Sequence, residues 1–135
     1  MGLDMYLYAK KVVETKVIDE AKWLTSTTYV EEGLGYWRKF NALHGFIVSN
    51  FADGEDDCNP VWLREENIEE IISTLKAIKE DNSKAMELMP PYHGFFFGSY
   101  EIDEWYIKNL EMSIPIFENA LSRCKEEDIF YGASW

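Results

Sequence analysis

The chain has 135 residues, of which 47% are hydrophobic and 16% are aromatic, so it can bury one sizeable core and we expect a single domain spanning residues 1–135. Its 25 acidic and 13 basic residues give a formal net charge of −12, and a surface of that sign repels nucleic acids and anionic membranes. Composition therefore excludes non-specific nucleic-acid binding, while the high aromatic share predicts rings that line a groove or an interface.

The cysteine and hydropathy patterns indicate the compartment. The two cysteines, Cys58 and Cys124, lack the CxxC spacing of redox and metal motifs, and a chain with a large core does not need a disulfide. Residues 1–8 contain Asp4 and no basic leader, and no apolar run reaches the length of a membrane span. We expect a cytoplasmic protein with no membrane partner.

The first half of the chain predicts two strands and a helix. Leu3, Met5 and Leu7 alternate with Asp4, Tyr6 and Tyr8, which is the period-two pattern of a strand. Residues 12–32 show little pattern beyond a second strand near 27–30, which ends at Gly33-Leu34-Gly35. Apolar residues from 36 to 51 then recur at helical spacing, so we expect the first helix to run from about Gly35 to Phe51.

The second half predicts more helix. An acidic turn at 53–57 precedes a short strand at 61–63, and a regular apolar stripe predicts a helix over 65–80. A short helical segment at 84–88, an extended piece at 94–98, a helix capped by Ser99 and a last strand at 128–135 complete the order. Because strands and helices do not alternate regularly, we expect an α+β fold with a small, mainly antiparallel sheet against about three helices.

Three polar residues near the apolar face of the first predicted helix are the main candidate site. Arg38, Asn41 and His44 follow one another at intervals of three residues, and burying such groups without partners is costly. One reading is a ligand site in which Arg38 meets an anion and Asn41 and His44 meet a polar edge. The other reading is an internal polar network that joins the helix to Asp4 and the tyrosines of the first strand.

A second cluster precedes the last predicted helix. Ser99, Tyr100, Asp103 and Trp105 combine capping residues with two rings. They suit ordinary helix capping, or a site in which a ring stacks on a planar ligand and Asp103 accepts a hydrogen bond from it. The candidate ligand-binding residues are Asp4, Tyr6, Tyr36, Trp37, Arg38, Asn41, His44, Ser99, Tyr100, Asp103 and Trp105.

Other chemistries have little support in the sequence. The acidic run at 53–57 lacks the spacing of a calcium loop and suits a solvated turn. With His44 and His93 as the two histidines and with scattered cysteines, we expect no metal and no cofactor. No hydrolase, metalloprotease, P-loop or dinucleotide motif occurs.

Several segments together resemble a family of small phage and prophage proteins. They are MGLDMYL at 1–7, GYWRKFNALH at 35–44, DGEDDC at 53–58, GFFFGS at 94–99 and the terminal SW. Small phage accessory proteins commonly act against host defence, either by inhibiting a defence protein or by sequestering a nucleotide-derived signal. The resemblance implies a role of that kind by analogy.

We therefore expect a non-catalytic, homo-oligomeric accessory protein that holds a small, planar, anionic, nucleotide-like ligand and so antagonises host defence signalling. An alternative is an acidic inhibitor that mimics nucleic-acid charge and blocks a basic site on a host protein. A further alternative, a small hydrolase, requires His44 to lie within hydrogen-bonding reach of Asp4 or Asp103 in an accessible cleft.

Overall fold

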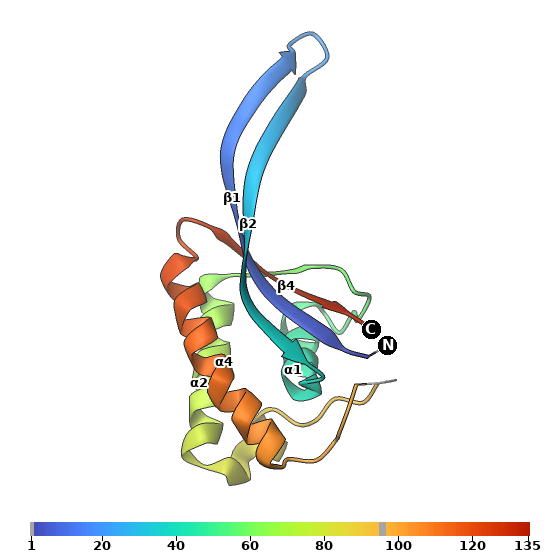
Figure 1. Cartoon of the computed structure of the whole chain (residues 1–135), viewed down its shortest axis with the longest axis vertical. Coiled ribbons are helices and arrows are strands. Elements are labelled where there is room, and N and C mark those ends of the chain that lie inside the picture. Colours follow the sequence, from blue (N-terminus) through green and yellow to red (C-terminus); the bar gives the residue numbers. More distant parts are fainter. Residues whose placement is uncertain (1, 95–96) are drawn as a thin grey trace.

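A four-stranded antiparallel sheet forms one layer of the protein. The computed structural model describes residues 2–94 and 97–135, and Figure 1 shows the arrangement. The sheet has the order β2-β1-β4-β3, and all three neighbouring pairs are antiparallel. The strands are β1 (Asp4–Asp19), β2 (Leu24–Arg38), β3 (Val61–Leu63) and β4 (Asp128–Ser134). The expected α+β fold class is confirmed.

Helices cover one face of this sheet. They are α1 (Asn41–Phe51), α2 (Glu65–Glu80), the short 3-10 helix η1 (Asn82–Lys84), α3 (Ala85–Leu88) and α4 (Glu104–Arg123). The predicted helix over 65–80 and the predicted strand over 61–63 have the observed bounds. Among the described residues, none of these helices combines the length and apolar character that a membrane crossing requires.

The alternating pattern of β1 decides which sheet face the helices cover. Leu3, Met5 and Leu7 are fully buried and join α1, α2 and α4 in one continuous core. The intervening Tyr6 and Tyr8 lie on the opposite, uncovered face. The core therefore lies between the sheet and the helices, as the period-two pattern of residues 3–8 predicts.

The first helix is shorter than predicted, and this changes the candidate site. Tyr36, Trp37 and Arg38 belong to β2, where they pair with Tyr6, Met5 and Asp4 of β1. Lys39 adopts a left-handed conformation with φ 58°, and the helix begins only at Asn41. Residues 36–38 form a strand because they pair with β1 and because the Trp37 ring is buried. Over so few positions, the spacing of the apolar residues fits a strand as well as a helix, so it did not distinguish between them.

Trp37 is a core residue, and this excludes it from the proposed site. Its indole Nε1–H donates to Ser113 Oγ at 2.7 Å, and its ring stacks on Phe117 with centroids 5.6 Å apart. The side chain is 1% exposed. Trp37 therefore joins β2 to α4 and has no surface left for a ligand.

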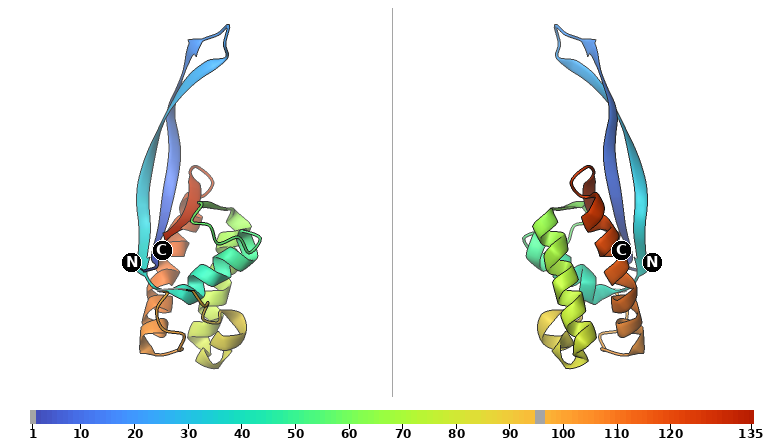
Figure 2. Two further views of the ribbon diagram at one scale, coloured as in Figure 1. Left: turned by 90° about the vertical axis from the view of Figure 1, so that its right-hand side faces the viewer. Right: turned by 90° about the vertical axis from the view of Figure 1, so that its left-hand side faces the viewer.

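Strands β1 and β2 extend far beyond the sheet as a two-stranded arm, which we define as residues 11–30. The last pair between β1 and β4 joins Lys10 to Asp128, and beyond it β1 and β2 pair only with each other. Figures 1 and 2 show the arm projecting away from the helices. Most of this hairpin was not predicted, because its residues bury neither face and therefore carry no clear hydrophobic period.

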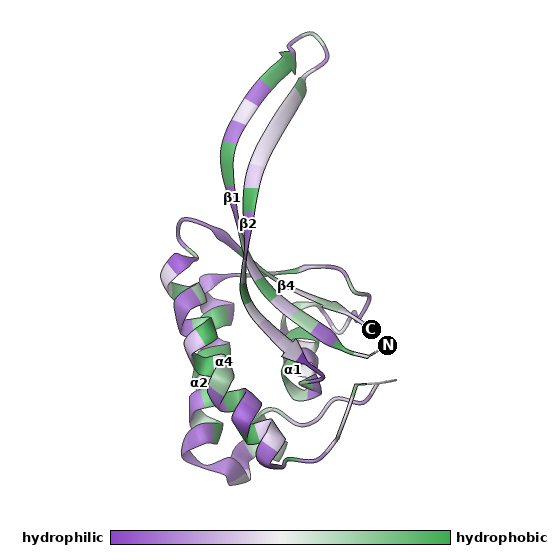
Figure 3. Cartoon of the chain, viewed as in Figure 1, coloured by the Kyte–Doolittle hydropathy of each residue, from purple (hydrophilic) through white to green (hydrophobic). Residues whose placement is uncertain are grey.

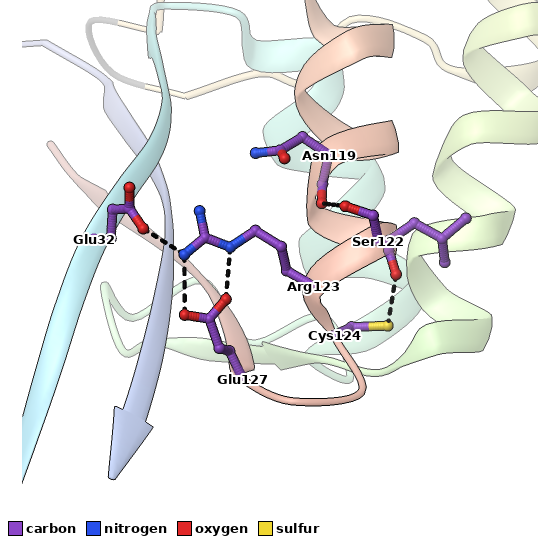
Figure 4. A network of polar contacts seen from close by, with 7 residues as sticks. Glu32, Asn119, Ser122, Arg123, Cys124 and Glu127 are labelled. Atoms are coloured by element: carbon purple, nitrogen blue, oxygen red, sulfur yellow. Dashed lines mark hydrogen bonds and ion pairs between the residues drawn. The ribbon is translucent and has the colours of Figure 1, made fainter. Parts of the chain in front are cut away.

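An arginine fixes the base of the arm to the helical layer (Figure 4). Arg123, at the end of α4, donates from Nε and Nη2 to the two carboxylate oxygens of Glu127 at 2.5 and 2.9 Å. The same guanidinium pairs with Glu32 of β2. The hydrogen bonds from Arg123, and to a smaller extent its charge, hold the pKa of Glu127 below its usual value. The base of the arm is thus fixed to the end of α4.

Candidate functional site

A cleft lies between the end of β2 and the start of α4. It has a volume of about 400 Å³ and is lined by Arg38, Lys39, Gly98, Ser99, Asp103 and Trp105. This volume is within the range of small-molecule sites, which is roughly 300–1,000 Å³. Four of the residues predicted to bind a ligand, Arg38, Ser99, Asp103 and Trp105, are therefore brought together here.

One wall of the cleft carries two cations. Arg38 Nη1 lies 2.7 Å from both carboxylate oxygens of Asp4, and the Tyr36 hydroxyl donates to Asp4 Oδ1 at 2.5 Å. These hydrogen bonds, first that of Tyr36 and then that of Arg38, lower the pKa of the Asp4 carboxyl. Asp4 therefore stays ionised and orients Arg38, but Asp4 itself is not one of the residues that line the cleft.

Lys39 lines the cleft beside Arg38, although it was not among the residues predicted to bind a ligand. Its backbone N–H donates to the carbonyl of Leu3 at 2.7 Å, which fixes the turn from β2 into α1. Its ammonium makes no ion pair with any carboxylate in residues 2–94 or 97–135. The signal was present in the sequence as a second cation next to Arg38.

The opposite wall carries an aromatic ring. Trp105 is 42% exposed, and its ring meets Phe40 edge to face with centroids 6.2 Å apart. Asp103, and not Ser99, caps α4, since the Asp103 carboxylate accepts from Tyr106 N at 3.0 Å. Ser99 Oγ accepts instead from Glu101 N at 3.1 Å. The cleft thus offers a partly exposed indole opposite two cations.

Asn41 supports the cleft from behind and does not face it. The side chain is 3% exposed, and its Nδ2 donates to the carbonyls of Phe97 and Ser99 at 3.1 and 2.8 Å. Its Oδ1 accepts from Tyr92 N at 2.9 Å. These bonds tie the segment before α4 to α1. The prediction that Asn41 reads the edge of a ligand is wrong, because its amide is fully used within the protein.

His44 is sealed in a second internal network. Its Nδ1 lies 2.6 Å from the Tyr131 hydroxyl and its Nε2 lies 2.9 Å from Asp56 Oδ1, while the ring is 2% exposed. Burial lowers the pKa of His44, against the opposing effect of Asp56. A neutral imidazole that accepts from Tyr131 and donates to Asp56 satisfies every group. Asn41 and His44 therefore belong to internal networks, but their partners are not Asp4 and the tyrosines of the first strand, as the internal-network reading predicted.

This network corrects two further predictions. The acidic run is more than a solvated turn, because Asp56 accepts from His44 and also from the Trp135 indole at 3.2 Å. Both ring nitrogens of His44 are bonded, and neither bond goes to Asp4 or Asp103. The arrangement that a hydrolase using His44 requires is therefore absent from the described structure.

The remaining predicted site residues lie outside the cleft lining. Tyr6 and Tyr36 contact each other on the uncovered sheet face, with ring centroids 5.3 Å apart. Tyr100 stacks on His93 at 4.0 Å and donates to the Gly94 carbonyl at 3.0 Å. The predicted extended piece at 94–98 includes residues 95 and 96, which lie outside the described residues.

Comparisons with protein-family models, with curated proteins and with solved structures found no match to this chain. Among the described residues, histidine, cysteine and carboxylate side chains form no group of three or more that could hold a metal ion.

Proposed function

We propose that the protein is a non-catalytic accessory protein that holds a small, planar, anionic ligand in the cleft between β2 and α4. The observation that carries this proposal is the joint placement of Arg38, Lys39 and Trp105 around one cleft of about 400 Å³. An indole face binds a flat ring by stacking. A cation near its edge then favours a ligand whose ring carries a negative group.

The electrostatics of the cleft support an anion more than a neutral ring. The Arg38 charge is partly balanced by Asp4, so Lys39 supplies the main uncompensated positive charge on this wall. Asp103 contributes a carboxylate to the opposite wall, and one of its oxygens, Oδ1, caps α4. A ligand with its ring against Trp105 and its anionic group toward Lys39 fits this distribution. Nucleotides have this combination.

The resemblance to small phage proteins gives this binding a biological setting. A protein that holds a nucleotide-like signal in a host cell lowers the concentration of free signal, which antagonises a defence pathway without chemistry. Sequestration requires tight binding, and both cations and the indole contribute to that affinity. We therefore place the protein among antagonists of host defence signalling as part of the same proposal.

Calorimetric titration with defined probes tests the cleft. We expect a nucleoside monophosphate or a cyclic dinucleotide to bind, and unphosphorylated adenosine to bind more weakly. Lys39→Gln should weaken binding about tenfold or more, as expected for loss of one charge-assisted hydrogen bond. Lys79→Gln is the matched control, because Lys79 is exposed on α2 and lies outside the cleft.

Two results would overturn the proposal. One is a panel of these probes that does not bind the folded protein at all. The other is equal affinity for the parent and for Lys39→Gln. Thermal unfolding of each variant must be measured alongside, and an unchanged melting temperature shows that the loss of binding is local.

An acidic protein inhibitor is the second candidate, and one feature of α2 favours it. Four exposed carboxylates, Glu65, Glu66, Glu69 and Glu70, occupy its first two turns. A basic site on a host protein would be attracted to this surface, and the attraction would weaken with salt. Binding of a host protein that survives high salt or that is unaffected by Glu69→Lys and Glu70→Lys together would exclude this candidate.

A further inference from the structure

The arm exposes apolar side chains that no other part of the described structure covers. Its eight large apolar residues have exposed fractions from 49% to 90%, with the maximum at Trp23. They are Val12, Val13, Val17, Ile18, Trp23, Leu24, Tyr29 and Val30. A two-stranded hairpin alone in water is marginally stable, and an apolar surface of this extent marks an interaction site. We therefore expect the arm to bind a partner.

The two edges of the arm differ in how they are protected. On the β1 edge the register skips Val13 and Ile18, which are bulges, and charged residues occur between them. Bulges and charges are the usual means by which proteins block edge pairing. On the β2 edge, residues 24–30 pair with β1 without interruption, and residues 23–30 contain no charge. Figure 3 shows the contrast, with purple and green bands on β1 and mostly pale colour on β2.

The charge distribution favours a second copy of the same chain as the partner. Residues 11–30 contain three lysines and three carboxylates, so the arm is neutral and the whole net charge of −12 belongs to the rest of the chain. Antiparallel pairing of two β2 edges would place the two acidic bodies at opposite ends of the shared arms. At about 3.3 Å per residue, seven paired residues keep the bodies roughly 20 Å apart, beyond the screening length of about 8 Å at physiological salt.

We infer that two copies of the chain pair through the β2 edges of their arms, antiparallel about a twofold axis at Thr27, and so form one continuous sheet. In this register Thr27 faces Thr27 of the second copy, Ser26 faces Thr28, Thr25 faces Tyr29 and Leu24 faces Val30. Each pair suits neighbouring strands, and no like charges meet. Beyond Leu24 and Val30, the same register brings Lys22 in the turn close to Glu32 of the second copy. Because of the twofold axis, this pair of opposite charges occurs at each end of the paired segment.

The same register accounts for Trp23, which is the most exposed large hydrophobic residue in the described part of the chain. Trp23 comes opposite Glu31 of the second copy. In this chain Glu31 lines a hollow of about 470 Å³ at the base of the arm, together with Tyr6, Tyr8 and Gly33. Gly33 contributes to the open space, because a Cβ built there would meet no atom within 4 Å. The hollow can therefore receive an indole, and Trp23 supplies one.

A pair of matched substitutions tests this interface. Thr15 and Thr27 are cross-strand partners at the same level of the arm, and both are exposed. Analytical ultracentrifugation should give a dimer of the 15.8 kDa chain. Thr27→Glu should raise the dissociation constant about tenfold, because it sets two carboxylates face to face. Thr15→Glu should leave the dimer nearly unchanged, because its charge lies one strand away from the twofold axis.

A charge-swap experiment separates loss of pairing from misfolding. Mixing Thr27→Glu with Thr27→Lys should restore a dimer that contains one copy of each, since opposite charges then meet across the axis. A monomeric parent at micromolar concentration would overturn the inference, as would a dimer that Thr27→Glu does not weaken. Equal dissociation by Thr15→Glu and Thr27→Glu would also overturn it, because it would indicate that two copies pack through the faces of their arms and not through the β2 edges. None of these results bears on binding in the cleft.

Discussion

Removing the buried histidine of the Tyr131–His44–Asp56 network should cost more than removing an ordinary surface hydrogen bond. His44→Leu leaves the Tyr131 hydroxyl without its partner at a position that is 1% exposed, which costs about 1–3 kcal/mol of unfolding free energy. Asp56 loses one bond but keeps the Trp135 indole and partial contact with water. We therefore expect a total loss of about 2–4 kcal/mol, a large part of a typical stability of about 5–15 kcal/mol.

A double-mutant cycle isolates the network. Tyr131→Phe alone leaves His44 Nδ1 without a donor, and should cost about 1–3 kcal/mol. The double variant removes both polar groups, so its cost should be smaller than the sum of the two single costs by about 1–3 kcal/mol. Urea unfolding of the four proteins at pH 8, with equal slopes against denaturant, measures these values. Strictly additive losses would refute the reasoning, because they would show that the two groups do not depend on each other.

Three further predictions follow from particular residues. Burial lowers the pKa of His44 below its ordinary value of 6.5, so the unfolded chain takes up this proton at higher pH than the folded one. Unfolding free energy should therefore decrease as pH falls through 6.5 toward the folded-state pKa, and His44→Leu should flatten that slope. Gly45→Ala should destabilise the protein in thermal unfolding although alanine favours helices, because the new Cβ would lie 2.4 Å from Tyr92 Cβ, whereas Gly33→Ala should be tolerated. Finally, Trp23→Ser should weaken the dimer in ultracentrifugation without lowering the affinity for cleft ligands, and equal dimer stability would contradict the seating of Trp23 in the hollow.

The parts of the fold that the sequence predicted are those whose pattern arises from local burial. Helix α2 buries Ile68, Ile71, Ile72, Leu75 and Ile78 at regular helical spacing, and β1 alternates buried and exposed residues near its start. These periods are visible without knowing what the element packs against. The fold class followed from the order of such elements.

The arm could not be predicted in the same way. Its residues are almost all exposed on both faces, so neither a period of two nor a period of 3.6 records a buried side. Its pairing depends on cross-strand bonds between residues as far apart as Lys11 and Val30. Local composition near 27–30 indicated strand, but not its length.

The candidate site was predicted only in part, because the sequence does not show which distant residues a polar side chain contacts. Arg38, Ser99, Asp103 and Trp105 do line one cleft, although the helix on which Arg38 was placed does not extend that far. Asn41 and His44 were correctly identified as polar groups in an apolar setting, but their partners are distant in sequence. His44, for example, bonds Tyr131, which is 87 residues away. One sequence without structure cannot show whether such a group meets a ligand or the protein itself.

Native mass spectrometry with a nucleotide probe shows whether Lys39 and Trp105 form a ligand cleft. The parent incubated with a cyclic dinucleotide should carry one added ligand mass per chain, and Lys39→Gln should lose most of that added mass while Lys79→Gln keeps it. Identical ligand occupancy in all three proteins, or no ligand on any of them across the probe panel, would contradict the account.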